Sequence, residues 1–194
     1  MSASDILKKN IVASIEAKTK FLDLHDQIDN FEKAAEAVLA SYRKGGRIYV
    51  AGNGGSAADA QHLVAEFVSK LARDRAPLAA EALTVDTSIL TAIGNDYGYD
   101  LVFARQVEGK MSENDIFLGI TTSGNSVNIL KALEACRQKS IPSVVFAGRD
   151  GGMALNKADY CIIANGEMTS TIQETHIVFA HSLCEYIERS IFWS

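Results

Sequence analysis

After Gly46 the chain alternates regularly between short apolar runs and longer segments of helical periodicity, a pattern that few folds accommodate. The apolar runs, which we predict to be strands, are 47–51, 80–85, 115–121, 142–147 and 160–164. The segments predicted to be helices are 56–71, 88–93, 100–110, 126–139 and 170–191. Strands that alternate with helices in this way are typical of a parallel sheet covered by helices on both faces. The predicted fold class is therefore α/β.

The segment before the first strand, residues 1–45, shows only helical periodicity. We predict two helices that form a hairpin, with a break at 26–30 and an end at the glycine pair 45–46. A helical hairpin in this position often serves an oligomer, so we expect residues 1–45 to contact other subunits. No low-complexity linker divides the chain, and we predict that 1–194 is one domain.

Composition narrows the classes of function. A net charge of -5 does not favour a nucleic-acid surface, and no segment has the ~18 unbroken apolar residues of a membrane span. Residues 1–10 lack the apolar stretch of a signal peptide. The cysteines Cys136, Cys161 and Cys184 are widely spaced, which fits buried thiols in a reducing compartment. We therefore expect a cytoplasmic protein that binds neither nucleic acid nor membrane.

Two polar turns follow predicted strands. Residues 52–56 read Gly-Asn-Gly-Gly-Ser, and residues 121–126 read Thr-Thr-Ser-Gly-Asn-Ser. Ligands of open α/β sheets bind beyond the carboxyl ends of the strands. Glycines let the backbone approach a ligand, and the amides at the start of a helix favour an anion. We expect Asn125 or Ser126 to cap the following helix and the other hydroxyls to bind phosphate oxygens.

Each turn alone is equally well explained as an ordinary turn between a strand and a helix. The first turn also matches the dinucleotide pattern GxGxxA, but Glu81 and Asp86 do not lie in a convincing register for the ribose. A P-loop is disfavoured because no lysine follows the glycines. Two turns rich in hydroxyl groups suit a monophosphate better than a pyrophosphate.

Histidine and carboxylate side chains follow the first turn. His62 and Glu66 are four residues apart on one face of the predicted helix, a spacing that suits metal ligands. Gln173 and His181 lie in the last helix, whose remaining face is apolar. We interpret the other histidines, His25 and His176, as core residues with satisfied hydrogen bonds.

Four segments, 52–67, 87–100, 121–126 and 172–181, together resemble the SIS-domain phosphoheptose isomerases, and the resemblance extends over nearly the whole chain. It implies a single SIS-type domain and the conversion of sedoheptulose 7-phosphate to D-glycero-D-manno-heptose 7-phosphate. That reaction is the first step of nucleotide-activated heptose biosynthesis, which serves lipopolysaccharide. It also implies a homotetramer with one zinc ion per subunit.

The resemblance also assigns roles to residues. Glu66 corresponds to the general base and His181 to the partner acid. The implied zinc ligands are His62, Glu66, Gln173 and His181. The implied substrate contacts are Asn53, Gly54, Gly55, Ser56, Glu66, Asn95, Asp96, Thr121, Thr122, Ser123, Ser126 and Gln173. The chain departs from the family at Lys70, where many members carry arginine, and in 75–81, where many are rich in proline.

The implied chemistry agrees with the residue types. Ketose–aldose isomerisation moves a proton between adjacent carbons, which needs a base near the carbons and an acid for the oxygens. A metal would polarise the carbonyl, and this donor set also accepts divalent ions other than zinc. Two features fit less well. A carboxylate bound to zinc is a weaker base, and Gln173 lies ~12 Å from His181 along the helix axis, so we expect neighbouring chains to complete the site.

Three other functions compete with the isomerase. A non-enzymatic SIS protein that binds the bacterial replication initiator shares the fold but lacks the acid–base residues that are present here. A regulatory domain that senses sugar phosphates would be accompanied by a DNA-binding segment. A nicotinamide enzyme would bind its cofactor in a fluorescence titration. The isomerase is the favoured hypothesis.

Overall fold

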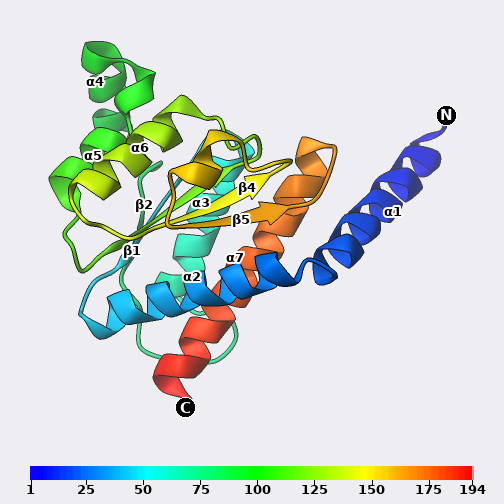
Figure 1. The fold of residues 1–194 in the computed structure, drawn as a ribbon, viewed down its shortest axis with the longest axis horizontal. Coiled ribbons are helices and arrows are strands. Elements are labelled where there is room, and N and C mark those ends of the chain that lie inside the picture. Colours follow the sequence, from blue (N-terminus) through cyan, green and yellow to red (C-terminus); the bar gives the residue numbers. More distant parts are fainter. Residues whose placement is uncertain (194) are drawn as a thin grey trace.

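A five-stranded parallel sheet forms the centre of the computed structural model, which describes residues 1–193 (Figure 1). The strand order is β2-β1-β3-β4-β5, and each neighbouring pair is parallel. The strands are β1 (Ile48–Gly52), β2 (Ala80–Ala82), β3 (Ile116–Thr121), β4 (Ser143–Gly148) and β5 (Tyr160–Ala164). The predicted α/β class is therefore confirmed.

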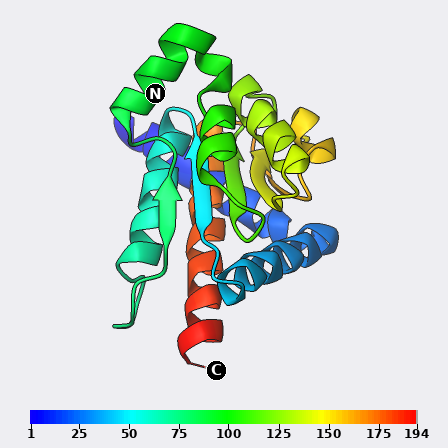
Figure 2. The same ribbon diagram turned by 90° about the vertical axis from the view of Figure 1, so that its left-hand side faces the viewer.

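Helices cover both faces of the sheet (Figures 1 and 2). The α-helices are α1 (Ala3–Leu22), α2 (His25–Arg43), α3 (Gly55–Val68), α4 (Thr87–Tyr97), α5 (Ala104–Lys110), α6 (Val127–Gln138) and α7 (Thr169–Phe192), with short 3-10 helices η1 (Tyr99–Leu101) and η2 (Gly152–Asn156). Residues of α2, α3 and α7 share one apolar cluster, and residues of α5 and α6 share another on the opposite face. Successive residues of β1 alternate between the clusters, Ile48 and Val50 in the first, Tyr49 and Ala51 in the second.

Several predicted boundaries need correction. Helix α3 ends at Val68 rather than at 71, β2 has three residues instead of six, and α4 extends to Tyr97. The predicted helix 100–110 is divided into η1 and α5. The predicted end of α2 is confirmed, because Gly45 has a φ of 77° and the amide of Gly46 donates to the Ser41 carbonyl.

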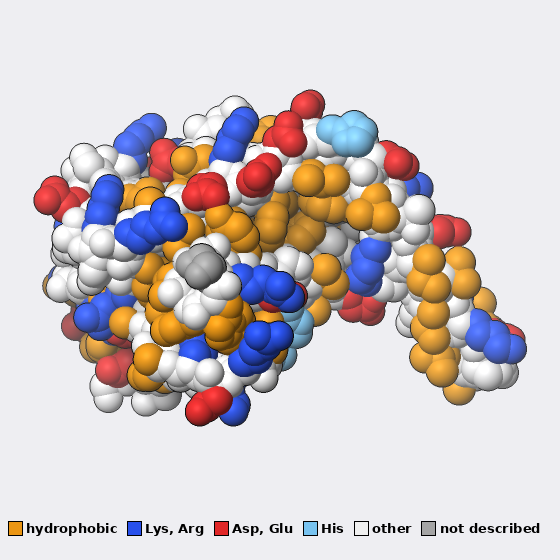
Figure 3. Space-filling view, turned by 90° about the horizontal axis from the view of Figure 1, so that it is seen from below, with side chains coloured by type: hydrophobic (Ala, Val, Ile, Leu, Met, Phe, Trp, Pro, Cys, Tyr) orange, Lys and Arg blue, Asp and Glu red, His pale blue; other side chains and the backbone are white. Residues whose placement is uncertain are grey.

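The two N-terminal helices do not form the predicted hairpin. The break lies at residues 23–24, earlier than predicted, and α1 projects outward from the start of α2 rather than folding back along it (Figure 1). Only Ala17 of α1 is buried. Its apolar residues are about half exposed and form a stripe on the projecting arm of Figure 3; they are Ile6, Leu7, Ile11, Val12 and Ile15. No helix within residues 1–193 is long and apolar enough to cross a membrane.

Candidate active site

The first polar turn connects β1 to α3. Gly54 has φ 56° and ψ -120°, a conformation that favours glycine, and it precedes the first residue of the helix. Among the first amides of α3, that of Ser56 donates to the Asn53 carbonyl and those of Ala57 and Ala58 donate to the Gly54 carbonyl, whereas that of Gly55 donates no hydrogen bond among residues 1–193. A Cβ on Gly55 would stand 2.3 Å from Nε2 of Gln173, so a larger residue would push the end of this side chain aside. The turn therefore combines the free Gly55 amide with a polar side chain from α7.

The second polar turn connects β3 to α6. The hydroxyl groups of Thr121 and Ser126 lie 2.9 Å apart, and the Ser123 hydroxyl accepts from the Asn125 amide at 3.1 Å. The predicted side-chain cap is wrong: Ser126 stands at the cap position without a capping bond, and Asn125 accepts from the Met153 amide instead. The hydroxyls are thus oriented by one another, and as both donors and acceptors they retain capacity for an anion.

A pair of asparagines joins the two turns. Nδ2 of Asn53 donates to Oδ1 of Asn128 at 2.9 Å, and Nδ2 of Asn128 donates to Oδ1 of Asn53 at 2.8 Å. The Tyr99 hydroxyl also donates to Oδ1 of Asn53, at 3.1 Å. Sequence reasoning missed Asn128 and Tyr99. The sequence signal for Asn128 is a polar residue among the apolar residues Val127, Ile129 and Leu130 at the start of a helix, whereas nothing in the sequence singles out Tyr99.

Three predicted residues meet at the other end of α3. Nε2 of His62 lies 3.1 Å from Oε1 of Glu66 and 3.4 Å from Nε2 of His181, which belongs to α7. The His62 side chain is 48% exposed and that of Glu66 is 21% exposed, so the group faces solvent. Two imidazole nitrogens at this distance need either a shared proton or a cation between them.

The geometry of this cluster fits a metal ion. Zinc bonds of about 2.0–2.1 Å place two tetrahedral ligands about 3.3–3.4 Å apart. The two distances in the cluster are 3.1 and 3.4 Å, and all three ligand atoms lie within 4.8 Å of one another. Three protein ligands with an open fourth position are typical of catalytic zinc. His62, Glu66 and His181 can therefore hold a divalent cation.

The structure places the other predicted residues apart from this cluster. The Gln173 amide lies against Gly55, at the opposite end of α3. Asn95 and Asp96 are exposed on α4, where Nδ2 of Asn95 donates to Oδ1 of Asp96 at 2.8 Å. Among residues 1–193, no hydrogen bond connects these two to the cluster or to the polar turns. Their predicted contacts with substrate and metal stay predictions.

The two remaining histidines differ from each other. His176 is 1% exposed and its Nε2 donates to the Ala147 carbonyl at 2.8 Å, which confirms the predicted core position, but its Nδ1 is buried without a hydrogen-bond partner among residues 1–193. Burial lowers the pKa of His176 to about 4, a shift that the hydrogen bond to Ala147 opposes. The same interpretation is wrong for His25, which is exposed at the start of α2.

A further carboxyl group lies between the first turn and the cluster. Asp59 precedes His62 by three residues on α3. Its Oδ2 is buried without a hydrogen-bond partner among residues 1–193, and burial raises its pKa while His62 opposes the shift. Sequence reasoning did not single out this residue.

Comparisons with known proteins identify the family of the chain. A family model described as "SIS domain" matches residues 13–148. A phosphoheptose isomerase of Aneurinibacillus thermoaerophilus is 48% identical over 97% of this chain and 96% of its own length, and phosphoheptose isomerase 2 of Campylobacter jejuni is 48% identical over 96% and 92%. The solved phosphoheptose isomerase of Neisseria gonorrhoeae has a TM-score of 0.89 and 38% identity, covering 96% of this chain and 99% of its own. That of Francisella tularensis has a TM-score of 0.91 and 34% identity, covering 97% and 100%.

Proposed function

Because the chain belongs to the SIS-domain family and, within it, to the phosphoheptose isomerases, we propose that it converts sedoheptulose 7-phosphate to D-glycero-D-manno-heptose 7-phosphate. The observation that carries this proposal is the cluster in which His62 and Glu66, on the helix that begins at the glycine-rich turn, meet His181 of α7. The product would enter the synthesis of nucleotide-activated heptose for lipopolysaccharide.

The proposed phosphate site lies at the two polar turns. Its groups are the first amides of α3 and the hydroxyls of the second turn, contributed by Asn53, Gly54, Gly55, Ser56, Thr121, Thr122, Ser123 and Ser126. The Asn53–Asn128 pair fixes one turn against the other. Gly55 and His62 are about 10 Å apart along the axis of α3, a distance that the extended carbon chain of a heptose phosphate spans. We propose that Asn95, Asp96 and Gln173 contact the sugar.

The proposed proton transfer uses Glu66 and His181. The carboxylate of Glu66 takes a proton from C1 of the ketose and returns it to C2, with an enediol between the two steps. Nδ1 of His181, the ring nitrogen that does not face His62, donates a proton to the carbonyl oxygen at C2 and accepts the proton that leaves the C1 hydroxyl. Each residue thus ends the cycle in the protonation state in which it began.

We propose zinc as the resident metal, one per subunit, held by His62, Glu66 and His181 with Gln173 as a further ligand. When bound, the ion supplies Lewis-acid polarisation of the carbonyl. Glu66 contributes one oxygen to the contact with His62, which leaves its other oxygen for the proton transfer. Within one chain Gln173 begins about 12 Å from His181 along α7, so we propose that a neighbouring copy completes the ligand set.

We further propose that the chain assembles as a homotetramer in which residues 1–45 contact neighbouring copies. The support is the exposed apolar stripe of α1, which the rest of the chain leaves uncovered. Light scattering on the purified protein tests this assembly. A cytoplasmic location is proposed from the three free, buried cysteines.

The function is tested by incubating the protein with sedoheptulose 7-phosphate and following the anomeric protons by NMR, with added zinc and with chelator. New aldose signals that are absent with Glu66→Gln support both the reaction and its base. A loss of turnover with chelator, restored by zinc, supports the metal. Sugar phosphate that binds but is not converted under any metal condition contradicts the isomerase.

A further inference from the structure

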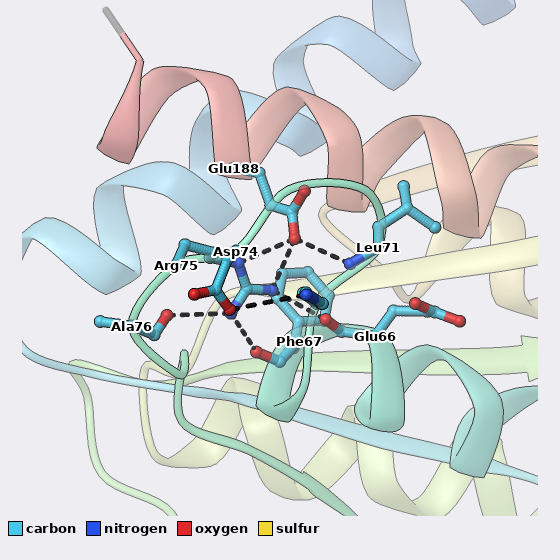
Figure 4. A network of polar contacts seen from close by, with 8 residues as sticks. Glu66, Phe67, Leu71, Asp74, Arg75, Ala76 and Glu188 are labelled. Atoms are coloured by element: carbon cyan, nitrogen blue, oxygen red, sulfur yellow. Dashed lines mark hydrogen bonds and ion pairs between the residues drawn. The ribbon is translucent and has the colours of Figure 1, made fainter.

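A buried ion pair lies next to Glu66 of the cluster, at the end of α3 (Figure 4). Nη2 of Arg75 is 2.7 Å from Oε1 of Glu188, and the two side chains are 1% and 0% exposed. Arg75 comes from the loop that follows α3, whereas Glu188 belongs to α7, 113 residues later. The pair therefore joins the two helices that carry the cluster.

Arg75 caps the end of α3. Its Nη2 donates to the Glu66 carbonyl at 2.7 Å, and its Nη1 donates to the Phe67 carbonyl at 2.8 Å. The last carbonyls of a helix have no partner within it, and a cation at this end interacts favourably with the helix dipole. The guanidinium thus fixes the backbone of Glu66, the proposed base.

Glu188 completes the connection on α7. Its Oε1 accepts from Nε of Arg75 at 2.8 Å and from the Leu71 amide at 2.9 Å. Glu188 follows His181 by seven residues, so both occupy the same side of the helix about two turns apart. Any shift of the Arg75–Glu188 pair would change the distance between His181 and the residues on α3.

Stability alone does not account for this pair. The desolvation of a buried ion pair often exceeds its Coulombic gain, and well-packed apolar residues of similar volume can be more stable. Oε2 of Glu188 adds to the cost because it is buried without a hydrogen-bond partner among residues 1–193. Apolar side chains, however, would supply none of the directional bonds that Arg75 makes to both helices.

We infer that Arg75 and Glu188 are positioning residues of the isomerase, which hold α3 and α7 at the spacing that the cluster of His62, Glu66 and His181 requires. This inference rests on the function proposed above for that cluster. Removal of the pair should impair the proton transfer and metal binding more than the binding of the phosphate, because the polar turns lie at the opposite end of α3.

The test compares Arg75→Lys, Glu188→Gln and the double variant Arg75→Met/Glu188→Leu with the wild type. Arg189→Lys is the matched control, since Arg189 is next to Glu188 but its side chain is 69% exposed and pairs with Glu185 at the surface. For each protein the melting temperature, kcat and KM are measured. The zinc dissociation constant is measured by competition with a chromogenic chelator, well below the melting temperature.

We expect Arg75→Lys and Glu188→Gln to weaken zinc binding by about 10–100-fold, the usual effect of removing a group that supports metal ligands. We expect kcat to fall by a similar factor, with KM changing less than about threefold. The double variant should recover the melting temperature but not zinc affinity or kcat. Arg189→Lys should match the wild type.

A folded double variant with wild-type zinc affinity and kcat would overturn the inference, because the pair would then serve stability alone. The inference would also be overturned if Arg75→Lys and Glu188→Gln changed only the melting temperature. If the wild type turns over without binding zinc, the metal part of the proposed function fails instead. In that case kcat of the three variants decides whether the pair positions Glu66 and His181.

Discussion

The two ends of α3 do different chemistry and are built in different ways. At the start, the free Gly55 amide and a glycine with φ 56° form a turn that is open to a ligand. At the far end, side chains from α3 and α7 meet, and Arg75 of the buried pair Arg75–Glu188 donates to the Glu66 carbonyl. The glycine turn itself follows from residues adjacent in the chain, with Asn128 and Gln173 packed against it, whereas the far end depends on residues 113 positions apart. We therefore expect changes at the start to affect binding and changes at the far end to affect turnover.

The largest effect that tests this division is expected for Glu66→Gln. The amide cannot accept a proton from carbon, so kcat should fall by about 10³-fold, within the range of general-base contributions. KM should change less than about twofold, because the phosphate groups lie at the other end of the helix. Steady-state kinetics at saturating zinc measure both constants, with the exposed Glu185→Gln as the control. A variant that retains wild-type kcat would remove Glu66 as the base.

The same division explains what could be predicted from the sequence. The strands, the two polar turns and the His62/Glu66 pair were predictable because each is a local pattern with a short period or spacing. The meeting of His62 with His181, at 3.4 Å, joins positions 119 residues apart, and only the resemblance to a family pointed to it. Nothing in the sequence indicated that Arg75 and Glu188 form a buried pair, since single charged residues in a loop and in a helix are usually solvated.

The N-terminal helices show another limit of local patterns. Periodicity predicted two helices correctly but gave neither the position of their break nor the direction of α1 (Figure 1). Only the last turns of α1 make apolar contacts within the described chain, where Ala17 is buried and the ring of Phe21 lies 4.8 Å from that of Phe179. The apolar residues before them, from Ile6 to Ile15, are exposed and do not report a contact within the chain. Its direction relative to α2 was therefore not encoded in a pattern of buried positions.

The next-largest effect is expected on the pH dependence of stability and comes from His176, which lies on α7 between Gln173 and His181. Its pKa is lowered by burial to about 4, from an ordinary value of 6.5, so the unfolded chain binds a proton more readily over that range. Stability should therefore fall as the pH decreases from 6.5 to 4, by at most roughly 3 kcal/mol from this group. Chemical denaturation across this range should show a flatter dependence for His176→Gln.

The exposed His25 offers the control for this measurement, because His25→Gln changes no buried group. An unchanged slope for His176→Gln would mean that the imidazole is not held neutral in the core. The result also shows whether unfolding of the domain accounts for a loss of activity at low pH.

A smaller effect is expected at the start of α3 and its partner turn. Ser126→Ala removes the hydroxyl that lies 2.9 Å from Thr121 and should raise KM by about tenfold, which corresponds to about 1.4 kcal/mol for one hydrogen bond to a charged group. We expect kcat to stay within about twofold. Ser123→Ala should behave alike. Kinetics with the sugar phosphate test both variants, and a fall in kcat at constant KM would contradict the division between the two ends.

The smallest effect is expected for Lys70→Arg. Lys70 lies just beyond the far end of α3, where Nζ is 3.5 Å from Oδ1 of Asp74, and the two side chains are 46% and 96% exposed. Such surface pairs contribute about 0–1 kcal/mol, and within one chain Lys70 stands at the end of the helix opposite the phosphate turns. Both kcat and KM should therefore stay within about twofold of the wild type. A tenfold lower KM would show that position 70 reaches the phosphate bound in a neighbouring subunit. The separation of binding from turnover along α3 would then hold within a single chain but not in the assembled enzyme.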